Sequence, residues 1–258
     1  MNPEKIFNQH QHPIQDARYT QYCKAQLDSI GALVMENFLS VDTLESLQNE
    51  AREVRPLAYF CSQNHNAYLL DSDHSLPDEH IRNLEQQSDK GCVPHDQIPD
   101  NSPLRTLYEW HEFRVFLESV LDVPVFPYAD TLSSININYY ERGQQLGWHY
   151  DNASFAITLM VQAPEEGGEF EYLEKVRNKE AGEQGYADTE AVIKGSLQPK
   201  TLAMGDGALV LFRGRNSLHR VAPVISDHAR ILVTLNFNTE AGIMLSELVR
   251  TTFFGRIV

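Results

Sequence analysis

The amino-acid sequence predicts an α+β protein whose core is a double-sheet jelly roll, with helices from the N-terminal half packed on one sheet. The first 122 residues combine helical segments with a long loop-like stretch, whereas residues 123–240 consist mainly of short β-rich segments. Gly, Pro and Asp turn signals separate these segments at a spacing typical of jelly rolls. At 258 residues the chain is long enough for one such domain, and no internal repeat divides it.

The N-terminal part, residues 1–122, is expected to hold one strand and two main helices. Residues 31–39 have the composition of a strand, and Ser40 can cap a helix over residues 41–54. A second helix is expected over residues 103–121, because Pro is favoured in the first turn and the apolar residues that follow form a stripe. Both helices present an apolar face that can cover a sheet.

The segment between these helices, residues 56–101, shows no clear period. Scattered His, Asp and Pro predict a long loop with short helices in it, one of them near residues 77–87. Its histidines, including His65, are expected to be solvated. Long loops in compact domains tend to be functional or mobile.

Nine strands are expected in the jelly-roll core. They are residues 123–127, 133–140, 147–150, 154–162, 168–173, 199–203, 207–213, 217–224 and 230–238. An insertion at residues 177–195 interrupts them and contains a helical stretch at 187–194, and residues 241–258 form a C-terminal extension. We expect residues 1–258 to form a single domain.

Composition excludes several function classes. The formal net charge of −15 disfavours nucleic-acid binding, which depends on a basic surface, and is compatible with a cationic small substrate. No run of eighteen apolar residues predicts a membrane helix, and the polar N-terminus does not resemble a signal peptide. The three Cys form no CxxC pair and predict no disulfides. A cytoplasmic protein is expected.

One short motif carries the strongest chemical signal. His149 and Asp151 stand two residues apart in a β-rich segment, so their side chains are expected on the same face. His219 follows a later apolar strand and can supply a third ligand. Two His and one carboxylate form the facial triad of non-haem Fe(II) sites, which leaves coordination positions open. Arg230, at the start of the last strand, offers a fork of donors for a carboxylate.

Two strands show a polar face that suits a ligand pocket. In residues 230–238, Ile231, Val233, Leu235 and Phe237 form an apolar face that should pack against helices or the outer core. The polar faces of the two strands consist of Arg230, Leu232, Thr234, Asn236 and Asn238 on one strand and Asn136, Asn138 and Tyr140 on the other. The alternative is that these polar residues face solvent on ordinary amphipathic strands.

These motifs resemble the Fe(II)/2-oxoglutarate-dependent oxygenases of the double-stranded β-helix superfamily. The narrower resemblance is to the free-amino-acid oxygenases that include the lysine halogenases and related hydroxylases. It lies in residues 147–152, 168–172 and 212–221 and in the closing residues 253–256.

The resemblance implies a role for each matching residue. His149, Asp151 and His219 would bind Fe(II), Arg230 would hold the far carboxylate of the co-substrate 2-oxoglutarate, and Asn138 and Tyr140 would help to hold it. O2 would be the oxidant. Halogenases of the group carry a small residue where this chain has Asp151, so the carboxylate favours hydroxylation over halogenation.

The leading hypothesis is therefore a hydroxylase of a free amino acid, such as lysine or another cationic one, that releases succinate and CO2. Residues suggested for substrate binding are Asn152, Glu169, Thr234, Asn236 and Asn238. The alternatives are an oxidative demethylase of a nucleobase and a non-catalytic jelly-roll module that binds metal. No nucleic-acid or membrane partner is expected, and the sequence does not give the oligomeric state.

Overall fold

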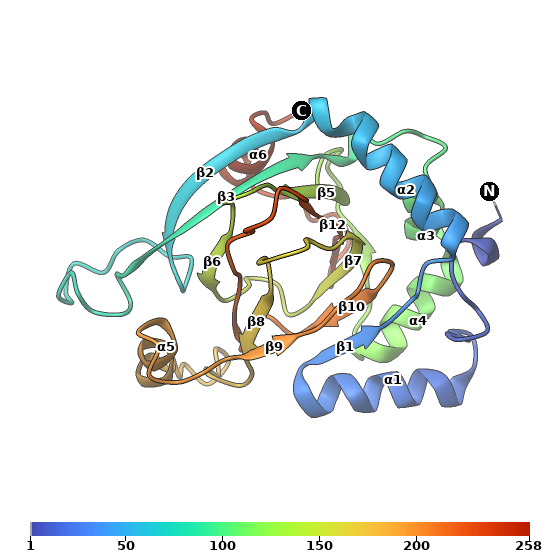
Figure 1. The fold of residues 1–258 in the computed structure, drawn as a ribbon. Coiled ribbons are helices and arrows are strands. Elements are labelled where there is room, and N and C mark those ends of the chain that lie inside the picture. Colours follow the sequence, from blue (N-terminus) through green and yellow to red (C-terminus); the bar gives the residue numbers. More distant parts are fainter. Residues whose placement is uncertain (1) are drawn as a thin grey trace.

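The computed structural model describes residues 2–258 and shows one strongly curled antiparallel sheet with helices on its outside (Figure 1). Neighbouring strands follow the order β1-β10-β7-β12-β5-β3-β6-β11-β8-β9, and β2 adds to β3. The single β3–β6 bridge, Ser88 opposite Leu146, joins the two halves of the jelly roll into a continuous sheet. The predicted jelly-roll class is confirmed.

The strands are short, as the turn signals predict. Their bounds are β1 Ala32–Met35, β2 Tyr59–Asn66, β3 Glu85–Val93, β4 Phe126–Pro127, β5 Ile135–Tyr140, β6 Leu146–His149, β7 Ala156–Gln162, β8 Phe170–Leu173, β9 Lys200–Leu202, β10 Leu209–Phe212, β11 Leu218–Val221, β12 Arg230–Leu235 and β13 Phe237–Asn238. The last strand expected from the sequence is thus divided, and β13 pairs with β4 in a separate two-stranded sheet.

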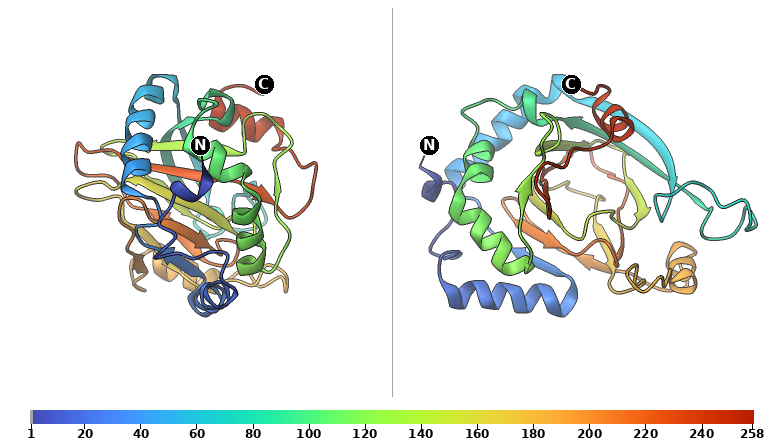
Figure 2. Two further views of the ribbon diagram at one scale, coloured as in Figure 1. Left: turned by 90° about the vertical axis from the view of Figure 1, so that its right-hand side faces the viewer. Right: turned by 180° about the vertical axis from the view of Figure 1, so that it is seen from behind.

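Four of the six α-helices in the described chain come from the N-terminal half. The helices are α1 Ala17–Ile30, α2 Val41–Val54, α3 Pro103–Glu109, α4 His111–Leu121, α5 Tyr186–Ile193 and α6 Glu247–Phe254, with short 3-10 turns at Pro3–Lys5, Arg55–Leu57 and His95–Gln97. Helices α1 to α4 lie together against one side of the curled sheet (Figure 2). None of the helices in residues 2–258 has the length and apolar character needed to cross a membrane.

The main core lies between these helices and the sheet. The apolar face of β12, including Ile231, Val233 and Leu235, is buried there, as the alternation predicts. Helix α2 starts where the sequence predicts, because the Ser40 hydroxyl accepts a hydrogen bond from the Thr43 N–H. The polar face of β12 is therefore left to point toward the interior of the curl.

The expectation of a loop over residues 56–101 was wrong for much of its length. Strands β2 and β3 form a long antiparallel pair in this segment, and no helix forms at residues 77–87. Because β2 is an edge strand with polar residues on both faces, it lacks the apolar alternation that marks a half-buried strand. His65 lies on β2 and is half-buried instead of solvated.

The helix expected over residues 103–121 is broken at Trp110, which adopts an extended conformation (φ −70°, ψ 123°). Neither Gly nor Pro marks the break, so the pattern could not reveal it. The indole packs against Phe7, with ring centroids 5.6 Å apart. Helices α1 and α6 were not expected, whereas α5 matches the helical stretch expected in the insertion.

Helix α4 provides a test of the core. Leu117 on this helix is fully buried, whereas Val115 is 43% exposed. Leu117→Ala should lower the free energy of unfolding by about 2–5 kcal/mol, because it leaves a cavity in the helix–sheet core. Val115→Ala should change it by less than about 0.5 kcal/mol. Urea unfolding followed by circular dichroism measures both, and equal losses would contradict this packing.

Candidate metal centre

The candidate centre is built on a cross-strand pair of histidines. His149 on β6 lies directly opposite His219 on β11, and the two ring centroids are 4.1 Å apart. Both side chains are buried. Directly opposed residues on neighbouring antiparallel strands point to the same face, so both imidazoles enter the interior of the curl.

Asp151 completes a three-residue cluster. It lies just beyond the end of β6, where its N–H donates to the Gly214 carbonyl at 3.1 Å. Its Oδ1 is 3.5 Å from Nε2 of His149 and 3.5 Å from Nε2 of His219. One ligand atom from each of the three residues lies within 4.8 Å of the others, so the predicted ligands are brought together.

Backbone hydrogen bonds orient both imidazoles. Nδ1 of His149 donates to the Gly147 carbonyl at 2.8 Å, and Nδ1 of His219 donates to the Ser217 carbonyl at 3.0 Å. This fixes the tautomer, so the lone pair of each Nε2 is directed at Asp151 and is free to bind a metal. Histidines that bind metals commonly have such a partner on the other nitrogen.

The charges at the centre suit a cation. Burial alone would raise the pKa of the Asp151 carboxyl, but the two imidazoles beside it outweigh burial and hold that pKa well below its usual range. Burial lowers the pKa of His149, and His219 lowers it further. Asp151 is therefore ionised and His149 neutral at neutral pH, which are the states that bind metals.

The residues fit Fe(II). Asp151 Oδ2 is buried and accepts no hydrogen bond from the described chain. A buried carboxylate oxygen without a partner is unfavourable, and a bound cation would satisfy it. Two imidazole nitrogens and one carboxylate on one side of an ion are the donor set of the facial triad. The cluster could therefore hold such an ion.

Gly214 is required by this packing, a role that no local sequence pattern reveals. A Cβ atom at this position would lie 1.8 Å from Asp151 Oδ2 and 3.0 Å from Cε1 of His219. The close approach of backbone to carboxylate holds Asp151 in place.

Arg230 lines a small cavity of about 140 Å³, which we call the inner cavity and which is also lined by the triad, Tyr140 and Phe212. The guanidinium is 1% exposed, lies over the Tyr140 ring and contacts the Met204 sulfur. Its Nε and Nη1 have no hydrogen-bond partner in the described chain. Burial lowers the pKa of Arg230, yet a guanidinium stays charged in proteins. A buried cation without an anion therefore lines the same cavity as the triad.

A second cavity of about 350 Å³, the outer cavity, is lined by His149 and Asp151 of the triad and extends to helix α6. Six residues line both cavities, namely Lys90, Asn138, Leu146, His149, Asp151 and Thr234. Val249 and Phe253 from α6 line only the outer cavity. Two ligands of the metal centre, His149 and Asp151, thus border both spaces, each of which can hold a small molecule.

The structure brings most of the predicted pocket residues to these cavities. Asn138 and Tyr140 line the inner cavity, and Asn152, Thr234 and Asn236 line the outer one. Glu169 is exposed, and neither Glu169 nor Asn238 lines either cavity. These two residues are not placed to contact a ligand at the centre.

Lys90 and His65 line the outer cavity but were not singled out from the sequence. Both belong to the β2–β3 pair, which the sequence does not reveal as strands. Recognising these two strands would have placed Lys90 on a strand next to β5 and His65 on the strand beyond it.

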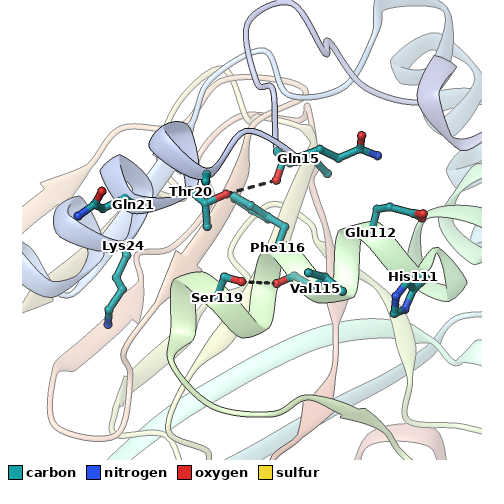
Figure 3. A pocket seen from close by; sticks show the side chains of 11 residues that line it. Gln15, Thr20, Gln21, Lys24, His111, Glu112, Val115, Phe116 and Ser119 are labelled. Carbon is teal, nitrogen blue, oxygen red and sulfur yellow. Dashed lines mark hydrogen bonds between the residues drawn. The ribbon is translucent and has the colours of Figure 1, made fainter.

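A larger groove of about 640 Å³ lies elsewhere, between α1 and α4 (Figure 3). It shares no residue with the two cavities at the triad. Thr20, Lys24, Glu112 and Ser119 are among its polar residues, and Figure 3 shows them spread along the two helices. No cluster of metal ligands lies there.

A profile of the family described as Halogenase D matches residues 15–251, which is most of the chain. The chain belongs to the Halogenase D family. No curated protein sequence matches it significantly.

Solved structures show the same fold as this Halogenase D family member. An oxidoreductase of the 2OG-Fe(II) oxygenase family from Burkholderia pseudomallei has a TM-score of 0.56 at 14% identity, over 87% of this chain and 92% of that one. The non-haem α-ketoglutarate-dependent carbocyclase SnoK gives 0.58 at 14% identity, over 92% and 93%. A prolyl 4-hydroxylase from Phytophthora capsici gives 0.53 at 18% identity, over 99% and 74%.

The contact between Gly214 and Asp151 gives a direct test of the centre. Gly214→Ala should push the carboxylate out of place and weaken Mn(II) binding by about 10–100-fold, as expected when a supporting contact of a metal ligand is lost. Gly205→Ala is the control, because its nearest contact would be an ordinary 3.4 Å from Glu36. His149→Ala provides the reference for full loss. Titration calorimetry measures all three, and undiminished binding by Gly214→Ala would contradict the arrangement.

Proposed function

We propose that this member of the Halogenase D family is an Fe(II)- and 2-oxoglutarate-dependent dioxygenase that hydroxylates a free amino acid. His149, Asp151 and His219 hold the iron, and Arg230 holds the far carboxylate of 2-oxoglutarate in the inner cavity. The substrate occupies the outer cavity. The three free cysteines suit a reducing cytoplasm.

The observation that carries this proposal is the isolated cation at Arg230. A fully buried guanidinium without an anion is unfavourable, and no acidic residue in the described chain lies within ion-pair distance of it. A ligand in the inner cavity could place a carboxylate on the Arg230 guanidinium and bind the metal at the triad through a second group of oxygen atoms. 2-Oxoglutarate has this form, and a guanidinium binds carboxylates in two-pronged fashion.

The bound iron, with O2 and 2-oxoglutarate, would supply the oxidation of a C–H bond, with release of succinate and CO2. The protein's own residues position the reactants. Phe212, Val210 and Ala156 form apolar walls that exclude water from the inner cavity. Asn138 is held by hydrogen bonds to the carbonyls of Asn136 and Leu232, so it presents a fixed amide to both cavities.

Asp151 supports hydroxylation over halogenation. The halogenases that this chain resembles have a small residue at this position, which leaves room for chloride. Here the carboxylate occupies that room and is held by the backbone of Gly214. A halide would have to displace a buried anionic ligand, which is unfavourable.

Arg230→Ala tests co-substrate binding. Loss of a buried, charged contact costs about 2–5 kcal/mol, so the 2-oxoglutarate concentration needed for half-maximal succinate formation should rise by roughly two orders of magnitude or more. Arg142→Ala is the control, because the Arg142 side chain is 66% exposed and pairs with Asp227 away from the cavities. An unchanged requirement in Arg230→Ala would show that another residue binds this carboxylate.

The product in the presence of chloride tests the reaction type. A screen of free amino acids with Fe(II), 2-oxoglutarate and ascorbate should reveal substrates by succinate formation. Mass spectrometry should then show a hydroxylated product even in excess chloride. Asp151→Gly should lose most hydroxylation and give at best weak chlorination, since the residues around the site must also orient the substrate. A chlorinated product from the unaltered enzyme would refute the hydroxylase proposal.

A further inference from the structure

The outer cavity contains one cationic side chain that the metal centre does not use, although the chain as a whole is strongly acidic. Lys90 is the one lysine or arginine that lines it among the described residues. Asp151 is its one carboxylate, and that side chain belongs to the metal centre. The net charge of −15 therefore resides elsewhere, and it gives no guide to the charge of the substrate.

Lys90 has a cationic head without an anionic partner. Its Nζ donates to Oδ1 of Asn138 at 2.9 Å and lies 5.0 Å from the centroid of the Phe253 ring. No acidic side chain in residues 2–258 lies within ion-pair distance of it. An ammonium group has three donors, so two remain for a ligand.

The direction of Lys90 points to the substrate instead of the co-substrate. Phe253 lines the outer cavity and not the inner one, so the ammonium group lies beside the outer space. Arg230 already supplies a cation to the inner cavity and does not line the outer one. Lys90 lines both cavities, and its contact with Phe253 places a second cation beside the outer one, so the two cations suit two different anions.

The remaining polar groups of the outer cavity are uncharged. Nδ2 of Asn236 donates to the Ser133 carbonyl, to Asn136 and to Thr234, which leaves its Oδ1 without a donor in the described chain. Such an amide oxygen can accept from an α-ammonium group. A second ammonium group on the substrate side chain would find no acidic partner and would be repelled by Lys90.

We propose that Lys90 binds the carboxylate of the substrate, and that the outer cavity takes an amino acid with an uncharged side chain. The proposal rests on the proposed function and narrows it. It also departs from the cationic substrate that the sequence suggested. Lys90 is then a specificity-determining residue that contacts the substrate and takes no part in the oxidation.

Direct binding tests the substrate class. The protein is loaded with Mn(II) and 2-oxoglutarate without O2, and each common amino acid is titrated by calorimetry. L-norleucine is added to the panel because it is L-lysine without the side-chain ammonium group. The tightest ligand should have an uncharged side chain, and L-lysine should bind at least about tenfold more weakly than L-norleucine, a difference of about 1.4 kcal/mol. Tightest binding by L-lysine or L-arginine, or no binding by any uncharged amino acid, would overturn the proposal.

A variant and a ligand derivative test Lys90 itself. Lys90→Met keeps a long side chain and the apolar contact with Phe253. It should lower the affinity for the tightest-binding amino acid by roughly 10–100-fold. The carboxamide of that amino acid should bind the unaltered protein more weakly than the acid does, by a similar factor. Lys90→Met should bind the acid and the carboxamide with equal affinity. The carboxamide comparison needs no variant, so it holds even if Lys90→Met folds poorly.

Lys24→Met is the matched control, because Lys24 lines the groove between α1 and α4 and should not affect binding. If Lys90→Met prefers the acid over the carboxamide as strongly as the unaltered protein does, the proposal is overturned. Lys90→Met should leave 2-oxoglutarate affinity unchanged, and a loss there would assign Lys90 to the co-substrate. If the proposed function is wrong, 2-oxoglutarate will not bind at all. If only this inference is wrong, 2-oxoglutarate will bind and the amino-acid titrations will fail.

Discussion

The register between β6 and β11 is the constraint on which the centre depends. It places His149 directly opposite His219, and their backbone-bonded Nδ1 atoms turn both Nε2 atoms toward Asp151. A slip of one residue would send one imidazole to the opposite face of the sheet and destroy the cluster. The irregularity in the pairing between His219 and Val221 lies next to this point, where a bulge can fix the register.

Charge placement divides the interior into two sites around this pair. Arg230 lines only the inner cavity, and Lys90 lines both cavities and contacts Phe253 of α6 beside the outer one. Each cation lacks an acidic partner in residues 2–258, and buried charges are retained at such a cost mainly where a ligand compensates them. Because acidic residues elsewhere dominate the net charge of −15, the net charge does not reveal these two cations.

Sequence reasoning reached the jelly-roll class, the three candidate ligands and Arg230, because each depends on a local pattern. His149 and Asp151 are two residues apart, and Arg230 starts a strand with a clear apolar face. It failed where the cause is tertiary. The β2–β3 pair is largely polar on both faces, so the sequence did not predict that Lys90 and His65 lie on strands beside the site. Gly214 acts on the site only through its contact with Asp151, a residue 63 positions away in the chain. Trp110, which packs on Phe7, lies at a helix break that neither Gly nor Pro marks.

One measurement tests the central claim most directly, namely a crystal structure of the protein grown without O2 in the presence of Fe(II) and 2-oxoglutarate. Anomalous scattering at the iron edge should show one ion bound by Nε2 of His149, Nε2 of His219 and the Asp151 carboxylate. The far carboxylate of 2-oxoglutarate should lie on Arg230 in the inner cavity, with the outer cavity open beside Lys90. Iron at another place, or 2-oxoglutarate on Lys90 with Arg230 still without an anion, would contradict the account.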